Sequence, residues 1–199
     1  RFGVNAALVH LMIEWTRGYV RGGADAAQAT AAELGMRATA INGPMQAAMQ
    51  IGMGAAGISA GWLVRPGKEK SALVLVPVWG ALAIGAIAFA DDWFAHSPGL
   101  RGMTVPVVFL LTVLAGIGFG GVLPLTISLS QKLLPHRTSL ASGLMMGGAW
   151  AVGSGGPPLA DWLTHRVGLD WAFVVVGALL SVGGVAAVGI PGWLVKKVS

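Results

Sequence analysis

Long stretches without a charged residue most constrain what this sequence can fold into. Five stretches of 20 to 30 residues lack Asp, Glu, Lys and Arg, and they run over 38–64, 71–90, 102–131, 138–160 and 171–195. A helix needs about 20 residues to cross the hydrocarbon core of a bilayer, and backbone polar groups in lipid must be satisfied within the segment. Strands of a membrane barrel are instead about 10 residues long, with alternating polarity. The pattern therefore predicts an all-α membrane protein.

The overall composition and the first 20 residues extend this prediction. Charged residues make up 11% of the 199-residue chain, against roughly 25% in an ordinary soluble domain. Only Glu14 and Arg17 are charged between positions 2 and 20, and an arginine near a helix end can extend its side chain to the membrane interface. We therefore expect residues 1–199 to form one bundle of six transmembrane helices. The predicted spans are 2–20, 39–64, 71–90, 103–129, 139–163 and 171–194. Residues 21–37 are predicted to be a connector, whose Ala-rich part can form a short surface helix.

Basic residues are distributed unevenly between the two sides of the predicted bundle. With six spans both chain ends fall on one side, which holds eight Lys and Arg against five on the other. Because cytoplasmic loops are enriched in Lys and Arg, we expect a multi-pass protein of the cell (inner) membrane with both termini cytoplasmic. The net charge of +5 is spread over these loops without a basic face or a recognition motif, which argues against a nucleic-acid partner.

Glycines and prolines lie mainly inside the predicted spans. Gly116 with Gly120, and Gly143 with Gly147, have the GxxxG spacing at which small residues let two membrane helices approach closely. Prolines within or at the ends of the spans remove backbone donors and bend helices. Such a bundle suits a protein that moves between conformations better than a static scaffold.

Three amide side chains form the clearest polar stripe. Asn42, Gln46 and Gln50 recur every four residues, so they share one face of the second predicted span. One interpretation is a cavity wall that hydrogen-bonds a solute. The other is a set of polar contacts between helices, each worth about 0.6–2 kcal/mol.

The first and fifth predicted spans carry further candidates for a substrate cavity. His10 and Glu14 lie four residues apart, and Asn5 lies nearer the start of the same span. An acid within a membrane span is a functional candidate, so Glu14 and His10 are candidates for proton coupling. The alternative is that Glu14 lies near the interface and pairs with Arg17. Trp150 lies in the middle of the fifth span, either lining a cavity or packed in the core.

No arrangement of residues indicates catalysis. Ser154 follows Val152-Gly153 and lacks the G-x-S-G pattern of an intramembrane serine protease. The glycine-rich run at 116–121 has no predicted strand before it, so it does not match a dinucleotide-binding loop. The four histidines lie on separate segments without metal-ligand spacing, and there is no cysteine. We expect no enzyme activity, no metal and no cofactor.

Three stretches of the sequence, 61–70, 118–147 and 153–173, together resemble the C-terminal six-helix half of a transporter of the major facilitator superfamily. Residues 61–70 are similar to a cytoplasmic loop motif of that family, with a one-residue gap and without the motif's Asp. The matching positions are Gly61, Arg65, Gly67 and Lys68. Residues 118–147 and 153–173 resemble a helix hairpin and the junction after it in fosmidomycin-resistance-like efflux members.

This resemblance implies secondary transport of a small organic solute by alternating access, in the direction of efflux. It implies that the first, second, fourth and fifth spans line a cavity, which a second half completes. Because the chain begins with Arg1 and not Met, we expect the N-terminal half to be missing, or replaced by a second copy of the chain. The alternative is a six-helix structural or assembly protein that transports nothing. The lipid bilayer is a partner in both cases, and the solute only in the first.

Overall fold

Helices form every regular element in the part of the chain that the structure describes, residues 2–23, 26–64, 68–95 and 100–189. In this computed structural model the α-helices are α1 (Phe2–Arg21), α2 (Ala31–Leu63), α3 (Glu69–Ala88), α4 (Ala90–Ala95), α5 (Thr104–Gly120), α6 (Leu123–Leu133), α7 (Thr138–Gly153), α8 (Gly156–Val167) and α9 (Leu169–Val185). Short 3₁₀ turns occupy Ala26–Gln28, Arg101–Met103, Pro135–Arg137 and Ala186–Gly189. The all-α prediction is confirmed for these residues.

Three helical segments are long and apolar enough to cross a membrane. They are Glu69–Ala88, Thr104–Gln131 and Leu169–Gly189, which coincide with the third, fourth and sixth predicted spans. Helices α1 and α2, at 20 and 33 residues, are long enough but less apolar, because polar side chains interrupt them. Among the described residues, length and composition therefore support three of the six predicted spans.

Two predicted spans, 103–129 and 139–163, each form two helices in the structure, and in both cases the second helix begins just before a proline. Helix α5 ends at Gly120 and α6 begins at Leu123, directly before Pro124. Helix α7 ends at Gly153 and α8 begins at Gly156, directly before Pro157 and Pro158. Proline lacks an N–H and its ring collides with the preceding turn, so it fits best at the start of a helix. Pro44 and Pro77, in contrast, lie inside the uninterrupted helices α2 and α3. The 16 residues of α7 are fewer than a straight span needs.

Helix α2 begins earlier than predicted and takes over part of the predicted connector. The Thr30 side chain accepts a hydrogen bond from the Glu33 N–H (3.3 Å), and Glu33 Oε2 accepts one from the Thr30 N–H (2.7 Å). This reciprocal capping box fixes the helix start at Ala31. The hydrogen bonds from the Thr30 backbone and hydroxyl also hold the pKa of the exposed Glu33 carboxyl below its usual value. The Ala-rich part of the predicted connector is therefore helical at 31–37, but these residues begin α2 and do not form a separate surface helix.

Glycines bring α5 into close contact with α2 and α3. A Cβ added at Gly116 or Gly120 would collide with the carbonyl oxygen of Met49 or Met53 on α2. On another face of α5, a Cβ added at Gly80 of α3 would lie 2.8 Å from the Cα of Gly118. The packing predicted for the first GxxxG pair is thus confirmed, because only a residue without a side chain fits this contact.

The second GxxxG pair lies in open space. A Cβ added at Gly143 or Gly147 of α7 would meet nothing within 4 Å. Of the residues of α7, only Ala141 and Gly153 are buried. The prediction that this pair packs a helix interface is therefore wrong within the part of the chain described.

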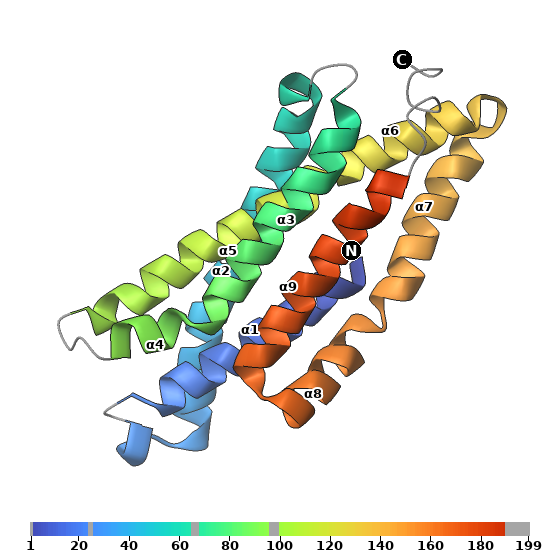
Figure 1. Cartoon of the computed structure of the whole chain (residues 1–199). Coiled ribbons are helices and arrows are strands. Elements are labelled where there is room, and N and C mark those ends of the chain that lie inside the picture. Colours follow the sequence, from blue (N-terminus) through green and yellow to red (C-terminus); the bar gives the residue numbers. More distant parts are fainter. Residues whose placement is uncertain (1, 24–25, 65–67, 96–99, 190–199) are drawn as a thin grey trace.

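Helix α1 packs against helices from both the early and the late parts of the chain (Figure 1). It contacts α2 on one side and α7, α8 and α9 on the other, and α9 in turn packs against α3. Its buried residues Leu8, Leu11 and Met12 belong to the same core as Met45 and Phe173. Helices α7 and α8 form one edge of the bundle, and α7 is its most exposed long element.

Candidate functional site

A cavity lies where the start of α1 meets α2, the α5–α6 junction and α7. Its volume is about 290 Å³, at the lower end of the range for ligand pockets. Residues from all these elements form its wall: Phe2, Asn5, Met53, Phe119, Leu123, Thr126, Ile127, Met145, Met146, Gly148, Ala149 and Val152. The break at Gly121–Val122 separates Phe119 on α5 from the three lining residues of α6, so both sides of this junction contribute to the wall.

Two short contacts hold α7 against this cavity. Gln131 Nε2 on α6 donates a hydrogen bond to Ser142 Oγ on α7 at 2.8 Å. At the other end of α7, a Cβ added at Gly153 would lie 3.2 Å from the Phe2 Cβ, so glycine permits the approach of α1. The rings of Phe2 and Trp150 lie 5.6 Å apart beside this contact. Helix α7 is therefore fixed at both ends, while its middle borders the cavity.

Among the described residues of the wall, two have polar side chains, and these two differ in their bonding. Thr126 Oγ1 donates to the carbonyl oxygen of Leu123 on its own helix at 2.9 Å. Asn5 Nδ2 lies 4.0 Å from Met53 Sδ, a weak acceptor. Asn5 Oδ1 is buried and accepts no hydrogen bond. Because buried polar atoms are nearly always bonded, the Asn5 amide stands out as the unsatisfied group of the wall.

The predicted stripe on α2 does not line this cavity. Gln46 Nε2 lies 3.4 Å from the Val9 carbonyl oxygen of α1 and 3.4 Å from Asn42 Oδ1. Asn42 is half-buried and Gln50 is exposed. Of the two interpretations offered above, the contact between helices describes Gln46.

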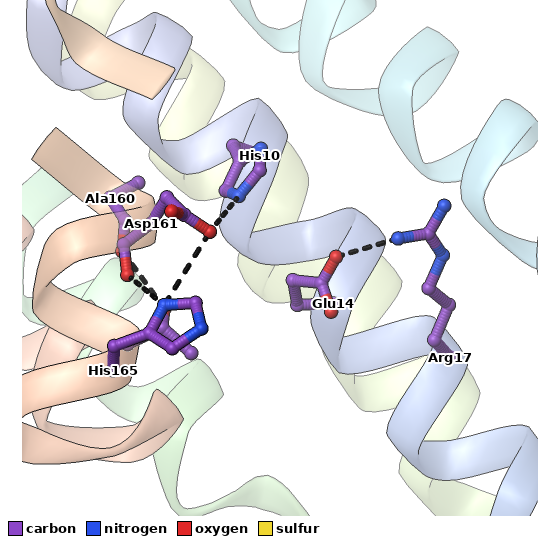
Figure 2. Close-up of polar contacts among 7 residues, drawn as sticks. His10, Glu14, Arg17, Ala160, Asp161 and His165 are labelled. Carbon is purple, nitrogen blue, oxygen red and sulfur yellow. Dashed lines mark hydrogen bonds and ion pairs between the residues drawn. The ribbon is translucent and has the colours of Figure 1, made fainter. Parts of the chain in front are cut away.

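The charged candidates of α1 lie in two separate contacts (Figure 2). Arg17 Nη1 donates to Glu14 Oε1 at 2.7 Å, the pairing expected if Glu14 lies near the interface. His10 points instead toward α8, where its Nε2 lies 3.8 Å from Asp161 Oδ1. Glu14 and His10 therefore have different partners and do not contact a common third group in this structure.

Asp161 was missed by sequence reasoning because it directly follows a charge-free stretch. Helix α8 continues to Val167, which places Asp161 and His165 on one helix face. His165 Nδ1 lies 2.8 Å from the main-chain oxygen of Asp161 and 3.6 Å from its Oδ1. The i, i+4 spacing was readable from the sequence, whereas the contact with His10 depends on how α1 packs against α8. In the described part of the chain, no three His, Asp or Glu side chains form a group that could hold a metal ion.

The remaining predicted residues lie at the surface or outside the described ranges. Trp150 is 65% exposed and is not part of the cavity wall, although its neighbour Ala149 is. Gly61 is in the exposed last turn of α2, and Lys68 precedes α3. Arg65 and Gly67 of the loop motif lie outside the described residues.

Comparisons with known proteins do not identify the chain. No protein family, no curated protein and no solved structure matches it.

Proposed function

We propose that this chain is one half of a secondary transporter that moves a small organic solute across the cell (inner) membrane by alternating access, in the direction of efflux. The single observation that carries this proposal is the cavity of about 290 Å³ among α1, α2, α5, α6 and α7. A solute-sized space between membrane helices is typical of transporters, whose binding sites lie between bundled helices with broken segments. The breaks at Gly121 and Ser154, next to this cavity, supply such segments.

The resemblance of residues 118–147 and 153–173 to efflux transporters supports the same proposal. Under it, both termini are cytoplasmic, and an N-terminal half or a second copy of the chain completes the solute path. We place proton coupling, as a further part of the proposal, at His10 and Glu14, with Asp161 as the partner of His10.

Filling the cavity tests this function. Gly148 lines the cavity, and a Cβ at this position meets nothing within 4 Å, so Gly148→Phe places a ring toward the cavity without a collision at its Cβ. Gly147→Phe is the matched control, because Gly147 is equally open and does not line the cavity. We expect Gly148→Phe to abolish efflux of small organic compounds from an efflux-deficient bacterial host that expresses the complete protein, and Gly147→Phe to retain it.

The same pair of variants separates the proposal from its alternative. A structural or assembly subunit needs no open cavity, so both variants would then support assembly equally and neither strain would show efflux. The exposed α7 is the feature that favours this alternative, because a partner protein could pack against it. Absence of efflux in the parent strain for every compound of a broad panel would overturn the transport proposal.

A further inference from the structure

We propose that the cavity selects an uncharged, mostly apolar molecule that carries a hydroxyl group, and that Asn5 determines this selection. The inference rests on the proposed function only in treating the cavity as a solute site. It concerns what the cavity binds, so it can be tested by equilibrium binding without transport.

The Asn5 amide has unused hydrogen-bonding capacity on both of its atoms. Its Oδ1 is buried without a donor, and its Nδ2 has only the thioether of Met53 at 4.0 Å. A thioether is a weak acceptor, so the amide gains little from this contact. A rotation of the Asn5 side chain that turns this buried oxygen toward the cavity therefore lets a ligand with a strong donor or acceptor supply what the protein lacks.

A hydroxyl group is the complement that fits this amide best. It can donate one hydrogen bond and accept others, so it pairs with either atom of the amide. The amide can also turn by 180° about its last bond and exchange the two atoms, and a hydroxyl still satisfies it. A group that only donates or only accepts would match one of these two orientations. Thr126 does not offer the same opportunity, because its hydroxyl proton is already given to its own helix.

The rest of the wall excludes charge and favours an apolar body. None of the described residues that line the cavity is charged. An ion placed against such a wall would lose its hydration without gaining a partner, which is costly. Met53, Met145 and Met146 contribute flexible thioether side chains that adapt to different apolar shapes, and Phe119 adds an aromatic face. This composition suits a flat or irregular hydrocarbon body better than a sugar or an amino acid.

Three naphthalene probes of similar size test the selection. They are 2-naphthol, 2-methylnaphthalene and 2-naphthoate, which present a hydroxyl, a methyl and a carboxylate on one ring system. Equilibrium binding is measured on the complete protein in phosphatidylcholine nanodiscs, with partitioning into empty nanodiscs subtracted. A typical hydrogen bond makes a roughly two- to tenfold difference in affinity, so we expect 2-naphthol to bind that much more tightly than 2-methylnaphthalene. We expect no saturable binding of 2-naphthoate.

Substitutions then assign the selection to Asn5. Asn5→Leu is expected to equalise the affinities of 2-naphthol and 2-methylnaphthalene. Asn42→Leu is the matched control, because Asn42 is also half-buried and lies outside this cavity, and it should keep the full preference. If Asn5→Leu folds poorly, Asn5→Ser takes its place as the test variant. Because serine keeps a short polar group at this position, Asn5→Ser should retain part of the preference for 2-naphthol. Gly148→Phe should abolish saturable binding of both neutral probes.

The outcomes distinguish this inference from the proposed function. Equal binding of the two neutral probes to the unaltered protein, with loss of both in Gly148→Phe, overturns the selection by Asn5 and leaves the cavity as a transport site. A preference that persists in Asn5→Leu also overturns it. Hydroxyl selection at Asn5 without efflux in the cavity-filling assay would instead uphold this inference and contradict transport.

Discussion

Replacing Gly116 by alanine should destabilise the bundle through a backbone collision between α5 and α2. The added Cβ would collide with the Met49 carbonyl oxygen and lie 3.1 Å from the Met53 N. An ordinary contact distance is about 3.5–4.0 Å, so the two backbones must separate, and the neighbouring contact at Gly120 must loosen with them. Overpacking of this kind costs about 1–3 kcal/mol. Alanine favours the helix by roughly 0.5–1 kcal/mol over glycine, which offsets part of that cost.

Gly143→Ala is the matched control, because it has the same spacing motif and open space around it. Its only expected effect is the gain of roughly 0.5–1 kcal/mol in helix propensity. The free energies of unfolding of the two variants should therefore differ by about 1–3 kcal/mol, the overpacking cost alone. Both are measured by titration with a denaturing detergent in mixed micelles, followed by circular dichroism. Equal stability of the two variants would refute the reasoning that glycine is required at the α2–α5 contact.

Three further perturbations test other parts of the account. Thr30→Ala removes the capping box and should speed amide hydrogen exchange in the first turn of α2 roughly fivefold. Because the bonds to Thr30 lower the pKa of Glu33, their stabilising contribution is present above the unfolded-state pKa and is lost as pH falls through the lowered pKa. Exchange rates that are the same with and without the Thr30 side chain would contradict this. Asp161→Asn should change the free energy of unfolding by less than about 1 kcal/mol, because this carboxylate is 59% exposed. Gly156→Ala should lower the free energy of unfolding by about 1–3 kcal/mol, because its Cβ would lie 2.8 Å from the Ala7 N. A larger loss of stability in Asp161→Asn than in Gly156→Ala would show that charge and not packing holds α8 on α1. Glu14→Gln in the complete protein should abolish proton-driven transport and spare solute exchange in proteoliposomes, and unchanged driven transport would remove Glu14 from proton coupling.

The positions of the most apolar helices followed from the sequence alone. Stretches without charge predicted the segments now seen in α3, α5–α6 and α9, because lipid admits long apolar segments only as helices. Proline positions predicted the helix breaks only in part, because the α5–α6 and α7–α8 breaks lie directly before prolines, whereas Pro44 and Pro77 lie inside the uninterrupted helices α2 and α3. Both patterns are local, so no knowledge of the partner helices was needed.

What packs against each helix could not be predicted in this way. Gly116 and Gly143 each begin a GxxxG pair, yet one meets a backbone and the other meets open space. Spacing shows which residues share a helix face, but it does not show what lies opposite. The same limit applies to His10, whose contact with Asp161 joins distant parts of the chain, and to Asn5, whose unsatisfied amide is recognisable only within the cavity.

Access to the cavity from both faces of the membrane tests the central claim most directly. The chain has no cysteine, so Ala149→Cys introduces a single thiol into the cavity wall of this chain. Its reaction with a membrane-impermeant thiol reagent is measured in sealed vesicles of each orientation, with the complete protein. Alternating access predicts labelling from both faces, with a transported solute changing the two rates. Labelling from one face only, at a rate that no solute alters, would contradict the account.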